Sequence, residues 1–315
     1  MIQARTIIQR LQPWQAWLCG GIVGYLALSA ATGTLRSFHW FMLLVIPLAF
    51  LGTERPKRFF LDWLPLFAFW LTYDRLRLIQ SLLLARVAVE WPYNLERYLF
   101  GWLTGGDVPA HWSRAWLAQQ AGTLHGAAIS GAAQFIYLSH LFVLPAILLY
   151  FWIGGNKNEA HRRSFTLYMK SFAALHVMGI LLYLLLPVAP PWWVSLNGTA
   201  QPTAQLVAET GVTSAMDGVI VQGLIRSAAH WFAAFPSLHG AYPVLMLLLA
   251  RGGSRLATGT LFVYMLAMFA STVVLNQHYI IDLIAGSAVA VAAWWMATLK
   301  RRKGEVPTPP WSAAR

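Results

Sequence analysis

The feature that most constrains this chain is a series of long apolar stretches separated by short polar segments. A helix needs about 20 apolar residues to cross the hydrocarbon core of a bilayer. We therefore expect an all-α, polytopic membrane protein with about eight transmembrane helices. The expected spans, of which the second, third and sixth are short, are residues 14–32, 38–53, 59–73, 128–153, 164–187, 237–250, 256–275 and 281–299.

Composition supports the same class. Charged residues make up 11% of the chain and hydrophobic residues 58%, whereas an average soluble domain carries about 25% charged residues. These values exclude an ordinary soluble enzyme, a disordered chain and a nucleic-acid-binding domain. The 16 tryptophans are typical of aromatic belts at membrane interfaces. The single cysteine, Cys19, excludes an intrachain disulfide framework.

The basic residues indicate an orientation. The chain has 23 Lys and Arg against 11 Asp and Glu, a net charge of +12. Loops on the cytoplasmic side of a membrane protein are enriched in Lys and Arg. If both termini are cytoplasmic, most basic residues fall on that side, including those of 157–163 and 300–303. We therefore predict a multi-pass protein of the cell membrane with cytoplasmic termini.

This topology divides the chain into N-terminal transmembrane helices in 1–58, a catalytic membrane domain in 59–299 and a flexible cytoplasmic tail in 300–315. Two long segments then lie outside, 74–127 and 188–235. The first alternates charged and aromatic residues, which is typical of an interfacial amphipathic stretch. We expect its Trp91, Tyr93 and Phe100 to lie near headgroup depth.

Ionisable residues at the expected outer start of the last span suggest a function, because such groups are costly at membrane depth. His278 and Asp282 in "NQHYIIDLIAG" are spaced i, i+4 and share one helical face. A carboxylate at one imidazole nitrogen fixes the tautomer and leaves the other nitrogen basic. This arrangement suits a histidine nucleophile or general base. The alternative is a polar pair that only packs helices together.

A second histidine motif, "FPSLHG", stands at the expected outer start of the sixth span. Pro236 and Ser237 are typical of a helix start, and a helix N-terminus binds anions. His239 would lie in the first turn, where it could protonate a departing oxygen. Gly240 would allow a close approach. The alternative is an ordinary capped span that happens to contain a histidine.

Two histidines, an orienting carboxylate and a helix N-terminus suit phosphoryl transfer without a metal. One histidine would attack phosphorus and form a phosphohistidine, the other would protonate the leaving group, and N–H groups with an arginine would hold the remaining oxygens. Zinc bound by His239, His278 and Asp282 is an alternative. The sequence lacks further compact ligand spacing, so we expect no metal and no cofactor.

These motifs resemble those of a known family. "PSLH", followed some forty residues later by "HYIID", is similar to the second and third signature motifs of the type-2 phosphatidic acid phosphatase superfamily, the lipid phosphate phosphatases. The wider context "PVAPPWW … FPSLHGAYP … NQHYIIDLIAG" resembles the inositol phosphorylceramide synthase branch. Bacterial relatives of that branch also have a YDxxR-like motif, similar to 73–77 here, and a Tyr–His pair, similar to Tyr137 and His140.

The resemblance implies a core of six helices with the site at their extracytoplasmic ends. Carried over to this sequence, it implies His278 as nucleophile, Asp282 as its orienting partner and His239 as general acid and base. It further implies phosphate contacts from Ser237 and Gly240.

The chain departs from the phosphatase pattern at its cations. Thr272 stands where the phosphatases have an arginine six residues before the nucleophile, and their first motif is replaced by a stretch ending at Pro187. These departures favour the transferase branch. A phosphate in a low-dielectric site still needs positive charge. The candidate residues for this role are, in order, Arg77, Arg75 and Arg226.

Each of these polar residues also has a simpler interpretation. Asp74 and Tyr137 are further candidates for substrate binding. Asp74 could instead pair with an arginine, and Arg75 and Arg77 could be an interfacial snorkelling pair. His140 could bind the acceptor hydroxyl or be hydrogen-bonded between helices. Trp192 and Trp193 could form an interfacial belt or stack on a headgroup; both pairs of alternatives remain open.

The sequence therefore predicts an integral-membrane phosphotransferase. It would move a phosphorylated headgroup, phosphoinositol-like, from a phospholipid donor to a lipid alcohol such as ceramide through a phosphohistidine. The alternative is a lipid-phosphate or isoprenyl-pyrophosphate phosphatase, for which water is the acceptor. A non-catalytic transporter or channel subunit is a third possibility. The sequence does not define the headgroup, the acceptor or the oligomeric state.

Overall fold

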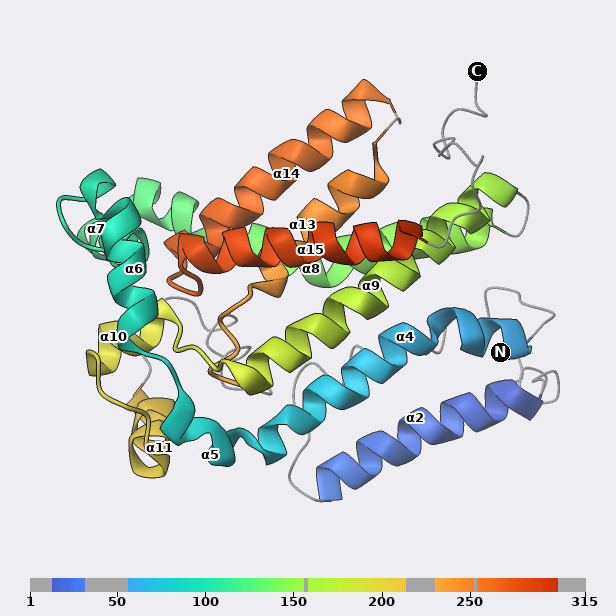
Figure 1. Cartoon of the computed structure of the whole chain (residues 1–315), viewed down its shortest axis with the longest axis horizontal. Coiled ribbons are helices and arrows are strands. Elements are labelled where there is room, and N and C mark those ends of the chain that lie inside the picture. Colours follow the sequence, from blue (N-terminus) through green and yellow to red (C-terminus); the bar gives the residue numbers. More distant parts are fainter. Residues whose placement is uncertain (1–12, 32–55, 156–157, 214–229, 252–253, 300–315) are drawn as a thin grey trace, which may run out of the picture. The chain divides into compact units, whose positions relative to one another are not determined.

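The computed structural model describes residues 13–31, 56–155, 158–213, 230–251 and 254–299, and in these ranges every regular element is a helix (Figure 1). β-Pairing appears in these ranges only as isolated parallel bridges that join Val188 to Ala88 and Ala233. The predicted span 38–53, the tail 300–315 and Arg226 lie outside the described residues.

The chain divides into two units, residues 1–64 with 219–228 and residues 65–218 with 229–315. The first unit contains α2 (Pro13–Ala31) and the first half of α4 (Pro56–Arg75). Asp62, an acidic residue inside an expected span, lies 4.0 Å from Arg58 one turn earlier. This i, i+4 pairing lowers the cost of a carboxylate in an apolar helix.

The second unit contains the polar motifs. After α4 the chain forms a series of short helices: η2 (Leu76–Leu78), α5 (Gln80–Leu83), η3 (Leu84–Arg86), α6 (Glu90–Phe100), η4 (Gly101–Leu103) and α7 (Pro109–Gln119). Two long helices follow, α8 (Leu124–Gly154) and α9 (Glu159–Leu185). Three shorter ones come next, α10 (Pro191–Asn197), α11 (Ala204–Thr213) and α13 (Leu238–Leu249), and then α14 (Arg255–Val274) and α15 (Ile280–Leu299).

Four of these helices, α8, α9, α14 and α15, are long and apolar enough to cross a membrane. They lie where the sequence predicts spans, with ends that differ by a few residues. Large apolar side chains such as Phe135, Val263 and Ile284 are exposed on them. In water such surfaces would aggregate, but in lipid they face a solvent of matching polarity. The chain is a membrane protein.

The short helix α13 lies at the centre of the second unit, where it packs against α8, α9, α14 and α15. Its 12 residues rise about 18 Å, which is less than the roughly 30 Å of a bilayer core. Most of its side chains are buried. Because neighbouring helices surround it, α13 can be apolar without crossing the whole membrane, which explains why the sixth expected span is short.

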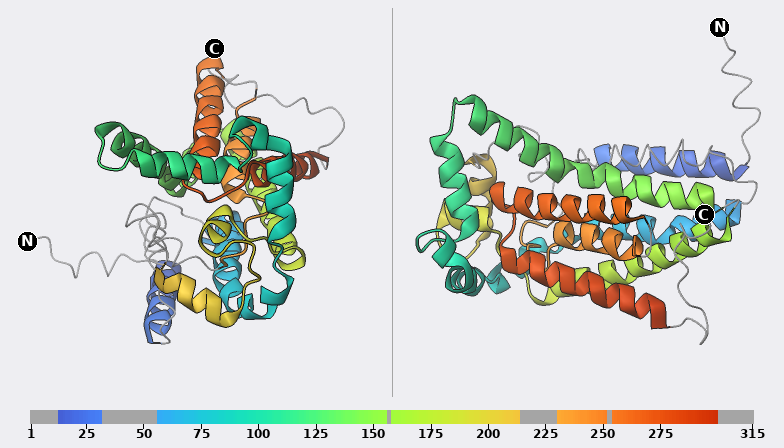
Figure 2. Two further views of the ribbon diagram at one scale, coloured as in Figure 1. Left: turned by 90° about the vertical axis from the view of Figure 1, so that its left-hand side faces the viewer. Right: turned by 90° about the horizontal axis from the view of Figure 1, so that it is seen from above.

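The polar helix ends meet at one end of this unit. The starts of α13 and α15 lie there with the ends of α9 and α14, and α6, α7 and α10 cover the same end (Figures 1 and 2). Helix α6 contacts α15, and α10 contacts α7. The short helices of the second unit therefore surround the region that carries both histidine motifs.

The two faces of α6 differ from the sequence-based expectation. Tyr93 and Phe100 pack inward against a buried cluster of Val108, Tyr279 and Ile281. Trp91 is 39% exposed, but the most exposed aromatic residues of this segment are Tyr98 and Trp102, at 84% and 77%. Residues 93, 96 and 100 share a helical face, so the aromatic residues of this stretch are divided between the protein core and the surface.

Candidate active site

Two histidines from the two motifs meet at the starts of α13 and α15. His239 is the second residue of α13, and His278 precedes α15 by two residues. His239 Nδ1 lies 3.0 Å from His278 Nε2. The pair is enclosed: His278 is 6% exposed and His239 is half-buried.

The hydrogen bonds of His278 define its tautomer. Its Nδ1 lies 3.1 Å from the carbonyl oxygen of Ala234. A carbonyl only accepts, so this nitrogen carries the proton and the Nε2 of the neutral ring has a free lone pair. His239 Nδ1 must then be the donor in the contact between the rings. The arrangement leaves His278 Nε2 nucleophilic and places a proton on the opposite ring.

Asp282 lies beside His278, but it is not the closest acceptor. Its Oδ2 is 3.5 Å from His278 Nδ1 and accepts the N–H of Tyr279 at 2.9 Å. Its Oδ1 is buried with no hydrogen-bond partner among the described residues. The backbone of Ala234 therefore orients the ring, and Asp282 adds a buried negative charge next to it. Such a charge stabilises positive charge that develops on the imidazole.

Ser237 and Gly240 join the two helix starts. Ser237 is fully buried and caps α13, because its Oγ accepts the N–H of Gly240 at 3.2 Å. Its own N–H donates to the carbonyl of Asp282 at 3.0 Å. A Cβ on Gly240 would lie 3.1 Å from Leu283 Cα, so this glycine allows α13 and α15 to approach closely. Phosphate contacts by Ser237 and Gly240 stay a prediction.

Tyr137 and His140, both on α8, surround the His239 ring. The Tyr137 ring stacks on His239 with centroids 4.7 Å apart, and His140 meets it edge-on at 4.6 Å. His140 Nδ1 contacts the carbonyl of Tyr137. That nitrogen must donate, so His140 presents its Nε2 as an acceptor. The structure thus brings the expected Tyr–His pair to the histidine centre, and its contact with an acceptor hydroxyl stays a prediction.

The expected phosphate-binding arginines are paired with Asp74. Asp74 is buried and forms an ion pair with Arg77, whose Nε–H also donates to the Asp74 carbonyl at 2.9 Å. Arg75 Nε lies 3.8 Å from the other carboxylate oxygen. The pairing of Asp74 with an arginine was one of the two sequence-based expectations. A contact of either arginine with phosphate stays a prediction.

Sequence reasoning did not single out two buried residues of the second unit, His176 and Glu96, and it left the placement of Trp192 and Trp193 open. His176, which no motif singles out, is buried and bonded through Nε2 to the Tyr242 hydroxyl at 2.8 Å. Trp192 and Trp193 are buried rather than in an interfacial belt, and Trp193 packs on Phe232. The most consequential omission is Glu96, a fully buried carboxylate on α6.

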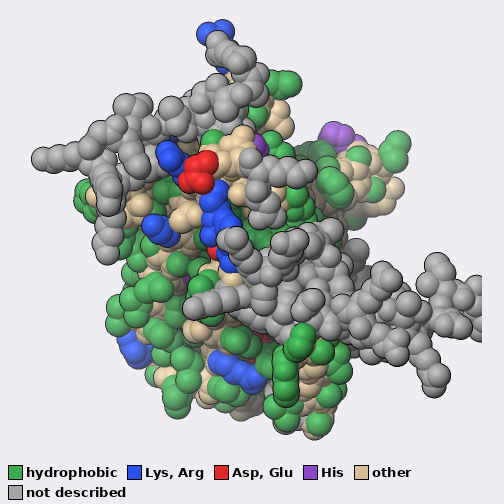
Figure 3. Space-filling view, turned by 90° about the vertical axis from the view of Figure 1, so that its right-hand side faces the viewer, with side chains coloured by type: hydrophobic (Ala, Val, Ile, Leu, Met, Phe, Trp, Pro, Cys, Tyr) green, Lys and Arg blue, Asp and Glu red, His purple; other side chains and the backbone are tan. Residues whose placement is uncertain are grey.

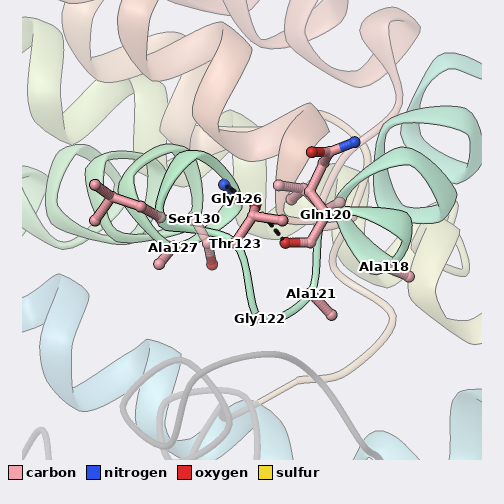
Figure 4. Close-up of a pocket in the computed structure, with 10 residues that line it drawn as sticks. Ala118, Gln120, Ala121, Gly122, Thr123, Gly126, Ala127 and Ser130 are labelled. Carbon is pink, nitrogen blue, oxygen red and sulfur yellow. Dashed lines mark hydrogen bonds between the residues drawn. The ribbon is translucent and has the colours of Figure 1, made fainter.

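Neither of two hollows in the second unit includes the histidine pair. One, of about 540 Å³, lies at the turn between α7 and α8, where Thr123 caps α8 by accepting the Gly126 N–H (Figure 4). The other, of about 340 Å³, is apolar and lined by α8, α13 and α14. In the described part of the chain no group of three or more His, Cys, Asp or Glu residues is placed to hold a metal ion.

Three proteins with sequences similar to this chain have names that refer to phosphoinositol or inositol phosphorylceramide. The phosphoinositol dihydroceramide synthase of Bacteroides thetaiotaomicron is 29% identical over 278 residues, which cover 86% of this chain and 87% of that protein. The inositol phosphorylceramide synthase catalytic subunit of Schizosaccharomyces pombe is 23% identical over 167 residues, and the inositol phosphorylceramide synthase of Candida albicans 24% over 163. These matches cover about half of this chain but only 37% and 33% of the fungal proteins.

No solved structure matches the chain. The model of the PAP2 superfamily, in contrast, matches residues 108–296, which include both histidine motifs and most of the second unit. This match covers more than half of the sequence and agrees with the resemblance of its motifs. The chain therefore belongs to the PAP2 superfamily.

Proposed function

We propose that the chain transfers phosphoinositol from a membrane phospholipid to a ceramide-like alcohol through a phosphohistidine on His278. The observation that carries this proposal is the contact between the bare Nε2 of His278 and the protonated Nδ1 of His239. It places a nucleophile opposite an acid. The names of the relatives support the choice of phosphoinositol and a ceramide as substrates.

In the first half-reaction His278 Nε2 attacks the phosphorus of the donor lipid. The N–P bond forms as the P–O bond to the glycerol breaks. His239 enters this step as the imidazolium, with a proton on each ring nitrogen, gives its Nδ1 proton to the departing diacylglycerol oxygen and becomes neutral. The negative charge of Asp282 stabilises the phosphorylated ring. In the second half-reaction the ceramide hydroxyl attacks phosphorus and gives its proton to His239 Nδ1. The N–P bond then breaks, and both histidines return to their initial states.

The two ring nitrogens are 3.0 Å apart, so no phosphoryl group fits between them in this structure. A phosphoryl group between them requires an attack distance of about 3–3.5 Å on one side and a hydrogen bond on the other. The two nitrogens must therefore move to roughly 6 Å apart when the lipid binds. Because His278 is tethered to Ala234 and lies beside Asp282, we expect the movement to fall to His239, whose ring packs on the aromatic rings of Tyr137 and His140.

The proposal includes a topology with eight spans, a six-helix core made by α4, α8, α9, α13, α14 and α15, and cytoplasmic termini. The histidine centre then faces the extracytoplasmic side. Basic side chains support this orientation. In the second unit Arg162 and Arg163 begin α9 at the end opposite α6 and α7, and basic side chains lie among hydrophobic ones in the view from that side (Figure 3).

Product analysis tests the activity. Purified protein in detergent is incubated with fluorescent ceramide and a panel of phospholipids that includes phosphatidylinositol. A new inositol-containing sphingolipid supports transfer. Release of inositol phosphate or phosphate without a new lipid would contradict transfer and favour a phosphatase. No consumption of any phospholipid would overturn both.

Two variants test the roles of the histidines. We expect His278→Asn to abolish turnover, and His239→Asn to lower it by a factor on the order of 10²–10⁴. His125→Asn is the matched control, because His125 is exposed and contacts Trp116 away from the site. A base-stable, acid-labile label from ³²P-phosphatidylinositol should appear on the wild type and not on His278→Asn. Full activity of either site variant would contradict the assignment.

The orientation has its own test. With Cys19 replaced by Ser, a single cysteine at the exposed Thr199 should react with an impermeant maleimide added to intact cells. Protection from the reagent in intact cells, with labelling after lysis, would invert the topology.

A further inference from the structure

Glu96 is a carboxylate that the proposed chemistry does not use. It lies on α6, and none of its surface is exposed. Ionised side chains are rarely buried without partners, because desolvation is costly. Both oxygens of Glu96 have partners on a distant part of the chain: Oε1 accepts the N–H of Ile280 at 2.9 Å, and Oε2 accepts the N–H of Ile281 at 3.1 Å.

These two N–H groups are the first of α15, the helix that follows the proposed nucleophile. The first N–H groups of a helix have no partner within the helix and need a cap. The sequence before Ile280 is Asn-Gln-His-Tyr, with no Ser, Thr, Asp or Asn directly before the helix. Asp282 takes the N–H of Tyr279, and Glu96 takes the next two. The cap that α15 lacks locally comes from a residue 184 positions earlier.

The position of α15 determines the geometry of the histidine centre. His278 stands two residues before Ile280, and its ring reaches both Ala234 and His239 at hydrogen-bond distance. A small rotation or shift at the start of α15 would move Nε2 away from the line of attack. Reacting groups must be held within about 0.5 Å of their productive positions, so whatever fixes the start of α15 also fixes the nucleophile.

We propose that Glu96 is a positioning residue for His278, which it holds in line by capping the start of α15 with both carboxylate oxygens. This inference rests on the proposed function, because it assumes that His278 is the nucleophile. Tyr93 and Phe100 pack on the same face of α6 as Glu96, against Tyr279 and Ile281. They keep α6 in place, so that the carboxylate acts from a fixed support.

The test replaces Glu96 with Gln, which has the same shape. The amide oxygen can still accept one of the two N–H groups. The amide nitrogen is itself a donor, so it cannot accept the other N–H and repels it. We expect Glu96→Gln to lower kcat for phosphatidylinositol consumption on the order of tenfold, with KM within twofold of the wild type, because Glu96 touches no substrate. The matched control is Glu90→Gln on the exposed start of the same helix, which should leave both constants unchanged.

Amide hydrogen exchange tests whether the cap forms, and it does not depend on enzyme activity. In wild-type protein the amides of Ile280 and Ile281 should exchange slowly, and in Glu96→Gln faster by tenfold or more, while those of α13 stay the same. Wild-type kcat in Glu96→Gln, an equal loss in Glu90→Gln, or rapid exchange of these amides in the wild type would overturn the proposal. If Glu96→Gln does not fold, the exchange rates of the Ile280 and Ile281 amides in the wild type still test the cap. Absence of turnover in the wild type, with both amides protected, would instead count against the proposed function.

Discussion

The starts of α13 and α15 lie side by side, yet they are capped in opposite ways. A neutral hydroxyl, that of Ser237, caps α13. Two carboxylates cap α15, because Asp282 takes the N–H of Tyr279 and Glu96 takes those of Ile280 and Ile281. Above the raised pKa of Glu96, about 7, the start of α15 therefore carries the negative charge of two carboxylates, where the cap of α13 carries none.

This difference indicates where a phosphate binds. The N-terminus of a helix carries roughly half a positive charge, which attracts anions. At α15 this partial charge is already compensated by two acidic side chains, and a third anion there would be repelled. At α13 it is not compensated by an acid of the cap. We infer that the oxygens of a bound phosphate lie toward α13, while the proposed nucleophile and the charge that would stabilise it lie at the start of α15.

The largest expected effect concerns the contact that holds these two starts together. A Cβ on Gly286 of α15 would lie 2.1 Å from the carbonyl oxygen of Ser237, a backbone atom that cannot move alone. Gly286→Ala must push the helices apart, and overpacking of this kind costs about 3 kcal/mol or more. We expect a clear fall in the melting temperature in detergent, together with loss of turnover.

Gly240→Ala is the graded comparison. Its Cβ would meet Leu283 Cα at 3.1 Å, a tight but smaller conflict, so the destabilisation should be about 1–2 kcal/mol. If Gly286→Ala melted at the wild-type temperature, the close contact between the two helix starts would be wrong.

The charge of Glu96 at the start of α15 should make the stability of the protein depend on pH. Burial raises the pKa of Glu96 to about 7, from an ordinary value of 4.5. Because the folded-state pKa is the higher one, its contribution to stability is full below about 4.5 and is lost as pH rises through about 7. Between these limits the contribution is about 3 kcal/mol. The other titratable groups around Glu96 and Tyr279 are Asp282, Tyr93 and Asp107.

The measurement is the melting temperature of wild type and Glu96→Gln at pH 5 and pH 8. Relative to the variant, the wild type should gain several degrees at pH 5, since Gln does not titrate. For Ser237→Ala the difference in melting temperature from the wild type should be the same at pH 5 and pH 8, because the cap of α13 is neutral. A difference for Glu96→Gln that does not change with pH would contradict the raised pKa.

The sequence predicts the α13 start better than the α15 start, for a physical reason. Pro236, Ser237 and Gly240 are local signals of a helix start, and the i, i+4 spacing of His278 and Asp282 is also local. The positions of the long apolar helices likewise follow from the sequence, because lipid requires continuous apolar stretches.

The contacts that complete the site are not local. The carbonyl of Ala234 that orients His278 is a backbone group 44 residues away, and no residue type marks it. Glu96 sits among charged and aromatic residues that read as an exposed amphipathic stretch, and its inward direction depends on how α6 packs on Tyr279 and Ile281. The alternation of aromatic residues in this stretch predicts two faces, but not which face the core takes.

The smallest expected effect comes from giving α13 an acidic cap like that of α15. It tests whether the neutral cap of α13 allows phosphate to bind there. Asp and Asn are both good helix caps and nearly equal in size, so Ser237→Asp and Ser237→Asn differ chiefly by one negative charge. We expect the Asp variant to bind inorganic phosphate or vanadate, measured as inhibition, about tenfold more weakly than the Asn variant, a difference of about 1.4 kcal/mol. The same pair of substitutions at Ser254, the exposed cap of α14, should leave inhibition unchanged. Equal inhibition of the two Ser237 variants would mean that phosphate does not lie at α13, and that the neutral cap has no part in choosing the site.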